Sequence, residues 1–197
     1  MKFLEVIQNR RSIYAIGKNI PVSREEIEKT IQTSIRHTPS AFNIQSAKAV
    51  ILFDREHDAF WDMLMEELRQ VVPAENFAST EQKILSFKAG YGTVLYFDDT
   101  DLTTSLEERF PLYAKNFKPW AEQANGIAQF AVWAALSEIG VGASLQHYSE
   151  LIEAKAKEKW QLPSSWRMIA QMPFGSIEAK ADAKEFDDIK QRVKIFG

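Results

Sequence analysis

Residues 120–139 read Trp-Ala-Glu-Gln-Ala-Asn-Gly-Ile-Ala-Gln-Phe-Ala-Val-Trp-Ala-Ala-Leu-Ser-Glu-Ile and form the longest apolar stretch of the chain. The pattern predicts one helix over this range that is hydrophobic on nearly every side. A helix of that kind is buried in a protein core or in a subunit interface. The loop Gly140-Val141-Gly142 follows directly and ends it. We therefore expect the fold to be built around this helix.

Shorter helices and strands are interleaved on both sides of this central helix. The predicted helices lie at residues 23–37, 54–70, 73–89 and 149–160. The predicted strands lie at residues 47–53, 93–97 and 166–172, and Pro173-Phe174-Gly175 closes the last of them. The alternation at residues 193–196 predicts a further edge strand, of a kind that can add to a neighbouring chain. The strand at 47–53 is apolar enough to be buried on both faces. This order, with helix dominating, is typical of an α+β or α/β domain.

Length and composition favour one soluble domain that spans residues 1–197. Hydrophobic residues make up 45% of the chain, so a sizeable core can form, and no linker, repeat or low-complexity tract divides it. The net charge is −3 with dispersed basic residues, which argues against a nucleic-acid partner. No stretch is long enough to span a bilayer, and the N-terminus lacks the apolar run of a signal peptide. We expect a cytoplasmic protein without a membrane partner.

The chain contains 0 cysteines. Disulfides, zinc–thiolate sites, iron–sulfur ligation and thiol catalysis are therefore excluded together. If the protein does redox chemistry, the electrons must reside on a bound cofactor, because no side chain here can hold them.

A compact anion-binding motif, Arg10-Arg11-Ser12, follows the short amphipathic stretch at residues 3–9. Guanidinium groups present a planar fork of donors that matches phosphate oxygens, and the Ser12 hydroxyl adds one more donor. Taken alone, the arginine pair is more often a solvated pair of helix-end cations, favoured there by the helix dipole.

A polar loop, Ser40-Ala41-Phe42-Asn43-Ile44-Gln45-Ser46, repeats this hydrogen-bonding chemistry without charge. Such loops often only satisfy their own backbone. Asn and Gln both donate and accept, however, which suits the edge of a heterocycle such as the pyrimidine of a flavin. The two interpretations are equally supported by this loop alone.

Other candidate motifs are weaker. Gly90-Tyr91-Gly92 and Gly140-Val141-Gly142 follow helices and lack the third glycine of a dinucleotide fingerprint, so we interpret both as helix ends. Asp98, Asp99 and Asp101 lack the pattern of a calcium loop and indicate a strand-to-helix turn with an acidic cap. No histidine pair has metal-ligand spacing, and we predict no metal site. His147 on its own is typical of a hydrogen-bonding core residue.

In their order and spacing, these segments resemble the FMN-dependent nitroreductase family from end to end. The segments that carry the resemblance are Arg10-Arg11-Ser12, the Pro39–Gln45 loop, the glycine loop followed by Ser144-Leu145-Gln146-His147, and Phe174-Gly175. The run Gln146-His147-Tyr148 and the compact length are most similar to the branch related to the fungal fatty-acid-repression protein. The resemblance implies an α+β fold with a central mixed sheet surrounded by helices. It also implies an intertwined homodimer with FMN at the interface.

The resemblance further implies a division of labour among the site residues. Arg10, Arg11 and Ser12 would hold the phosphate and ribityl chain, and Lys184 would reach the phosphate. Ser40, Asn43 and Gln45 would belong to the flavin site, with Ser40 and Asn43 supplied by the partner subunit. Leu145, Gln146 and His147 would lie along the isoalloxazine, with a backbone N–H near N5.

Many members of the family carry a basic residue two positions after the motif's serine, where this chain has Tyr14. Lys83 or Lys88 could replace that cation. The implied activity is two-electron reduction of nitroaromatic or quinone-like acceptors by NADH or NADPH, in a ping-pong cycle without a catalytic side chain, because the flavin carries the chemistry. A flavin-binding dimer with a sensing role is the alternative, and a structural dimer without ligand is a third possibility.

Overall fold

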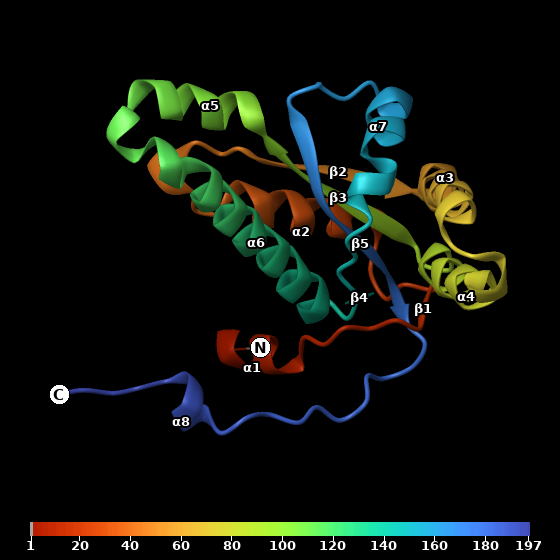
Figure 1. Ribbon diagram of the computed structural model, residues 1–197. Helices are drawn as coiled ribbons and strands as arrows, with labels where there is room; N and C mark the ends of the chain where they lie inside the picture. Colours follow the sequence, from red (N-terminus) through yellow and green to blue (C-terminus); the bar gives the residue numbers. More distant parts are fainter. Residues whose placement is uncertain (1) are drawn as a thin grey trace.

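The computed structural model describes residues 2–197 and is centred on a five-stranded sheet (Figure 1). The strands are β1 (Ile16–Gly17), β2 (Ala47–Phe53), β3 (Gly92–Asp99), β4 (Gly142–Ala143) and β5 (Trp166–Ile177). Their order is β1-β5-β3-β2, and β4 also pairs with β5. The paired strands run antiparallel, and a bridge between Ser12 and Ala143 adds a parallel contact. The predicted α+β fold with a mixed sheet is thus confirmed.

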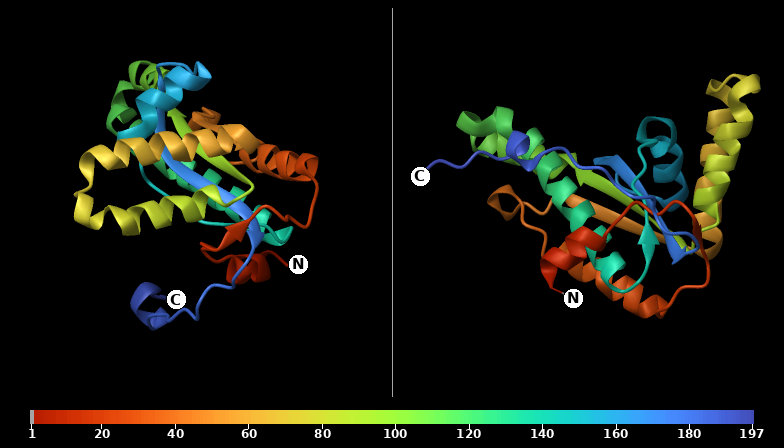
Figure 2. Two further views of the ribbon diagram at one scale, coloured as in Figure 1. Left: turned by 90° about the vertical axis from the view of Figure 1, so that its right-hand side faces the viewer. Right: turned by 90° about the horizontal axis from the view of Figure 1, so that it is seen from below.

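Helices cover both faces of this sheet (Figures 1 and 2). They are α1 (Phe3–Asn9), α2 (Arg24–Arg36), α3 (Asp54–Val71), α4 (Phe77–Lys88), α5 (Thr100–Arg109), α6 (Ala114–Glu138), α7 (Ser149–Trp160) and α8 (Ile189–Arg192). One hydrophobic cluster joins the sheet to α3, α4 and α7, and a second joins the opposite face to α2 and α6. The result is a three-layer arrangement with the sheet in the middle.

Strand β3 is the centre of the core because both of its faces are covered. Leu95 and Phe97 belong to the cluster with α3, α4 and α7, whereas Val94 and Tyr96 belong to the cluster with α2 and α6. All four side chains are fully buried. The expected burial on both faces is wrong for β2, where five of the seven residues are only half-buried, because β2 is an edge strand with β3 as its neighbour.

The central helix is longer than predicted. Helix α6 begins at Ala114 and contains Pro119, which the prediction treated as preceding the helix. The buried side chains of Phe117 and Ala121 on either side of this proline hold the helix together despite the lost backbone hydrogen bond. The helix is also less uniformly buried than expected, since Ile127 and Phe130 are exposed on one face.

The last long strand does not close at residues 173–175, as predicted, but continues to Ile177. It changes partners there, from β3 to β4 and β1. Gly175 permits the change, because a Cβ atom at this position would lie 2.2 Å from the carbonyl oxygen of Gly17. The short strand β4 lies in a segment that the sequence indicated only as a connection.

The C-terminal segment extends away from the body of the molecule (Figures 1 and 2). Residues 193–196, for which an edge strand was predicted, form no strand within the chain. Ile195 and Phe196 are 91% and 92% exposed. Pairing of this segment with a second chain therefore stays a prediction. Within residues 2–197, none of the helices combines the length and the apolar character needed to cross a bilayer.

Candidate functional site

Arg10, Arg11, Ser12 and Lys184 lie around one cavity of about 590 Å³. We call these four residues the arginine cradle. The motif follows α1, and residues 179–185 of the tail cross opposite to it and form the other wall of the cavity. Arg10, Arg11 and Ser12 are thus brought close to Lys184, which lies more than 170 positions later in the sequence. Tyr14 also lines the cavity, with its side chain 54% exposed.

Arg10 is held in place without its charge being neutralised. Its guanidinium stacks on the ring of Trp133 in α6, with the Cζ atom 4.3 Å from the ring centroid. Its Nε atom is buried and has no hydrogen-bond partner among the residues that the structure describes. Burial, followed by repulsion from Arg11, lowers the pKa of Arg10. A buried donor and an unpaired charge favour an anion in the cavity.

Arg11 and Lys184 complete the cradle from its two walls. Arg11 donates a hydrogen bond to the carbonyl oxygen of Asp182 at 2.8 Å, which ties the tail to the motif. Lys184 places its ammonium 5.3 Å from the ring of Phe186. Three cationic side chains therefore border a cavity that has room for a phosphate and a sugar-like chain.

The segment Gly142–His147 is joined directly to the arginine motif. The carbonyl oxygen of Ala143 accepts hydrogen bonds from the backbone N–H of Ile13 at 2.9 Å and from Nε1 of Trp133 at 3.1 Å. The parallel bridge between Ser12 and Ala143 fixes the register of the two segments. The arginine motif is therefore joined to the start of the 143–147 segment at Ala143.

Strand-like pairing decides which N–H groups of this segment are available to a ligand. The N–H of Gln146 donates to the carbonyl oxygen of Gln171 at 2.7 Å, and the N–H of Gln171 returns a bond of 2.9 Å. Successive N–H groups of an extended chain point in opposite directions. Across residues 2–197, neither the N–H of Leu145 nor that of His147 has an acceptor. These two groups, rather than that of Gln146, are the candidates for the predicted contact with N5.

The side chains of this segment also alternate, between buried and exposed. Gln146 is buried, and its amide donates to the hydroxyl of Ser144 at 3.0 Å. His147 is exposed and lines a cavity of about 650 Å³, so its interpretation as a hydrogen-bonding core residue is wrong. The core histidine is His57, which contacts Thr93 and the carbonyl oxygen of Lys88.

The Ser40–Gln45 loop lies outside the arginine cradle. Ser40 lines a separate cavity of about 400 Å³ together with Trp120 and Ile127. Phe42, Asn43 and Gln45 all have positive φ angles, between 50° and 55°, which is uncommon outside glycine. The Ser40 hydroxyl accepts a hydrogen bond from the N–H of Gln45 at 3.0 Å and closes the loop on itself. Within a single chain, this loop and the arginine cradle therefore line different cavities.

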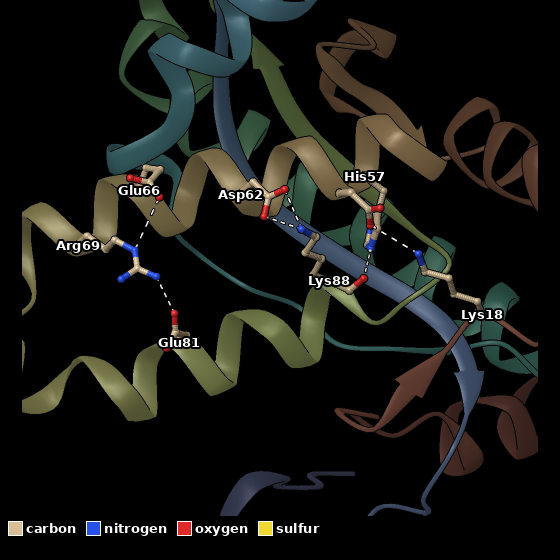
Figure 3. Close-up of polar contacts among 8 residues, drawn as sticks. Lys18, His57, Asp62, Glu66, Arg69, Glu81 and Lys88 are labelled. Carbon is tan, nitrogen blue, oxygen red and sulfur yellow. Dashed lines mark hydrogen bonds and ion pairs between the residues drawn. The ribbon is translucent and has the colours of Figure 1, made fainter.

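The two candidate replacements for a cation at position 14 have different surroundings. Lys88 makes an ion pair with Asp62, with 2.6 Å between Nζ and Oδ1, between α3 and α4 (Figure 3). Lys83 has no carboxylate partner within residues 2–197, and its ammonium lies 6.0 Å from the ring of Tyr148. Of the two lysines, Lys83 is therefore the one without a carboxylate partner among the described residues, and it lies near Tyr148, which follows directly after residues 145–147.

The acidic and glycine motifs behave as local structure. Asp99 is the N-cap of α5, although its carboxylate makes no capping hydrogen bond. Gly140, with a φ angle of 77°, ends α6 in the left-handed conformation. Gly90 does not have a positive φ angle; its role is close packing, because a Cβ atom there would lie 2.8 Å from the carbonyl oxygen of Phe174. Residues 2–197 contain no cluster of three or more metal-ligating side chains.

Sequence reasoning missed two components of the site. Trp133 was assigned only to the apolar helix, yet it contacts Arg10 and anchors Ala143. The carbonyl oxygen of Asp182 was not considered because backbone acceptors carry no sequence signal. A tryptophan on an otherwise alanine-rich helix face was the only available hint for Trp133.

Comparison with known proteins gives one consistent result. The sequence profile described as the nitroreductase family matches residues 7–176. The Saccharomyces cerevisiae protein HBN1 is 34% identical over 196 residues, which is 98% of this chain and 96% of HBN1. The S. cerevisiae nitroreductase FRM2 is 30% identical and covers 93% of this chain and 92% of its own length.

Solved structures agree with the sequence relatives. The nitroreductase CinD from Lactococcus lactis, in complex with nicotinic acid, superposes with a TM-score of 0.94 at 40% identity over 100% of both chains. CinD has also been solved in complexes with chloramphenicol and with 4-nitrophenol. A nitroreductase-type structure from Desulfovibrio desulfuricans, in complex with FMN, shares the fold at 18% identity, with a TM-score of 0.71.

Proposed function

Because the chain belongs to the nitroreductase family, we propose that it is an FMN-dependent NAD(P)H oxidoreductase that reduces nitroaromatic or quinone-like acceptors by two electrons. The observation that carries the proposal is the arginine cradle, in which the Nε of Arg10 has no hydrogen-bond partner among residues 2–197. The segment that is joined to the cradle through Ala143 adds the N–H groups of Leu145 and His147, which have no acceptor among the same residues. The aromatic molecules bound by the similar protein CinD support an acceptor of this class.

The residues of the cradle fit the phosphate of FMN. Arg10, Arg11 and Lys184 would neutralise its two charges, and Ser12 would donate to an oxygen. When bound, FMN supplies hydride transfer through its N5 atom. The chain's own contribution is to orient the ring along residues 145–147, with the N–H of Leu145 or His147 directed at N5. Lys83 would supply the positive charge that Tyr14 lacks, and so stabilise developing negative charge on the ring.

The second half of the site would come from a second copy of the chain. Ser40, Asn43 and Gln45 are separated from the cradle within one chain, which accords with their delivery by a partner subunit. Phe3 and Leu4 of α1 are each 69% exposed, and α6 exposes Ile127 and Phe130. Burying these side chains between two subunits would remove a large apolar surface from water.

The direct test is the colour and redox behaviour of the purified protein. We expect a yellow protein that bleaches without oxygen when NADH or NADPH is added, and that regains its absorbance when a nitroaromatic acceptor follows. A colourless preparation that FMN does not reconstitute would refute the proposal. Parallel titrations with NADH and NADPH would identify the preferred donor.

Deleting residues 191–197 tests the shared site. The tail exposes apolar side chains at Ile195 and Phe196, which fits strand addition to a partner. We expect the truncated protein to dimerise more weakly and to bind FMN more weakly, because the two equilibria are linked. Size-exclusion chromatography with light scattering, on apo and FMN-loaded protein, measures both. A flavin-loaded monomer of 22.5 kDa would contradict the shared site.

A flavin-binding sensor with little turnover is the second candidate, and Tyr14 favours it. An exposed phenol in the cradle, where relatives of the chain are expected to carry a cation, would stabilise reduced flavin less well. Such a protein would bind FMN but bleach slowly with both nicotinamides. Lys83→Met separates the two candidates: if Lys83 supplies the missing charge, this substitution slows bleaching in an otherwise fast enzyme.

A further inference from the structure

Trp133 connects three elements that meet at the cradle. It lies in α6, one face of its ring supports the guanidinium of Arg10, and its Nε1 donates to the carbonyl oxygen of Ala143. The same carbonyl accepts the N–H of Ile13, directly after the arginine motif. One side chain thus contacts both the predicted phosphate end and the base of the predicted ring-binding segment.

The position of Arg10 depends on this ring because little else holds it. Its Nε has no hydrogen-bond partner, and its charge is not offset by a carboxylate among residues 2–197. A guanidinium over an indole ring is attracted by the ring's quadrupole, and the planar stack also limits its rotation. An arginine fixed in this way keeps its fork of donors directed into the cavity before any ligand arrives.

We propose that Trp133 is a positioning residue that preorganises Arg10 for the phosphate of the cofactor and, through its N–H, holds the 143–147 segment at the matching distance. This inference rests on the proposed function, because it takes FMN as the ligand. It assigns two separable roles to one side chain. The ring face acts on phosphate recognition, and the N–H acts on the segment that contacts the flavin ring.

The two roles predict different patterns in two substitutions. Trp133→Leu removes both the stack on Arg10 and the N–H. Loss of the N–H weakens both ligands, whereas loss of the stack weakens only the ligand with a phosphate. The affinity for FMN therefore falls more than the affinity for riboflavin. The difference should be about threefold to thirtyfold, the range expected for a cation–π contact. Trp133→Phe keeps an aromatic face but removes the N–H. It should restore the ratio of FMN to riboflavin affinity to nearly the parent value, while both affinities fall together.

A matched control is provided by Trp160. Its indole N–H also makes a hydrogen bond, to Glu56, and a lysine ammonium lies 5.7 Å from its ring, but it packs on the opposite face of the sheet. Trp160→Leu should lower thermal stability without changing the FMN-to-riboflavin ratio. Circular dichroism melts of all variants report whether each one folds.

The experiment is isothermal titration of the apo forms of the full chain with FMN, riboflavin and inorganic phosphate. The proposal is supported if Trp133→Leu selectively weakens FMN and phosphate, and Trp133→Phe restores the selectivity. It is overturned if a folded Trp133→Leu loses FMN and riboflavin affinity equally, or if phosphate binds as in the parent. If the parent binds no FMN, the proposed function fails. If the parent binds FMN and the ratio is unchanged, only the role of Trp133 fails.

Discussion

The arginine cradle differs from the buried hydrogen-bond network of His57, Thr93, Trp61 and Lys88 in whether its polar groups have partners. We call this network the His57 junction. At the junction, a carbonyl can only accept, so the Nε2 of His57 donates to the oxygen of Lys88 (Figure 3). The Nδ1 atom then accepts a hydrogen bond of 2.8 Å from the hydroxyl of Thr93. The oxygen of the same hydroxyl accepts a hydrogen bond from the N–H of Trp61. Every group of this network has a partner within the chain.

At the cradle, by contrast, the Nε of Arg10 is buried without a partner and its charge borders a cavity. A satisfied buried network stabilises the fold, whereas an unsatisfied one beside open space is arranged for a ligand. Disturbing the junction should therefore change stability and leave ligand binding alone. Disturbing the cradle should do the reverse.

Thr93→Val tests the junction and has the largest expected effect. The substitution keeps the shape of the side chain but leaves the N–H of Trp61 and the Nδ1 of His57 without partners. Each orphaned group costs about 1–3 kcal/mol, so for two groups we expect the free energy of unfolding to fall by about 2–6 kcal/mol in total. Urea unfolding at fixed protein concentration measures this. The ratio of FMN to riboflavin affinity should not change.

Thr103→Val is the matched control for that substitution. Thr103 is as buried as Thr93, but its hydroxyl has no hydrogen-bond partner. Removing an unpaired hydroxyl leaves nothing orphaned, so stability should be unchanged or higher. A loss as large as that of Thr93→Val would mean that the network at His57 is not the source of the effect.

Arg11→Ala tests the cradle. A charge-assisted hydrogen bond contributes about 1.5–3 kcal/mol, so FMN affinity should fall roughly tenfold to a hundredfold, while riboflavin binds parent and variant alike. Arg55→Ala serves as the control, because the Arg55 side chain is 92% exposed and pairs only with the neighbouring Glu56. Equal losses for FMN and riboflavin in Arg11→Ala would show that Arg11 does not contact the phosphate.

The pH dependence of stability has the smallest expected effect. Burial is the main cause that lowers the pKa of His57 from its ordinary 6.5. As the pH falls below 6.5, His57 becomes protonated in the unfolded chain while it stays neutral in the folded chain. The free energy of unfolding therefore falls, by at most about 1.4 kcal/mol per pH unit. The loss continues until the pH reaches the folded pKa.

His57→Gln should flatten this dependence of the free energy of unfolding on pH. The comparison is made above pH 4.5, because the pKa values of Glu25 and Glu56 are lowered from their ordinary 4.5, so these two groups change stability only below that pH. Unfolding of parent and variant across this range measures the difference. An unchanged slope would exclude His57 as its source. His37→Gln, at an exposed position after α2, is the control.

Local patterns predicted the elements of the fold and several parts of the site. The helix predicted from residue 23 is confirmed, with the Ser23 hydroxyl accepting a hydrogen bond from the N–H of Glu26, and the buried residues of α2 and α3 recur at helical spacing. Arg10–Ser12 were chosen for their charge and spacing and Lys184 from the family resemblance, and the structure places all four around one cavity. What local patterns did not reveal was that the buried histidine is His57 and not His147, because burial of a histidine depends on which elements pack over it.

The sequence by itself determined the family, the central helix and the set of cationic side chains, because periodicity and motif order depend only on neighbouring residues. Only the tertiary structure decided that β5 continues through Gly175 and that Trp133 supports Arg10. It also decided that Lys88 pairs with a carboxylate whereas Lys83, within residues 2–197, contacts aromatic rings instead. These outcomes depend on contacts between segments far apart in the chain. Their geometry is set by the packing of helices onto the sheet, which no short stretch of sequence encodes.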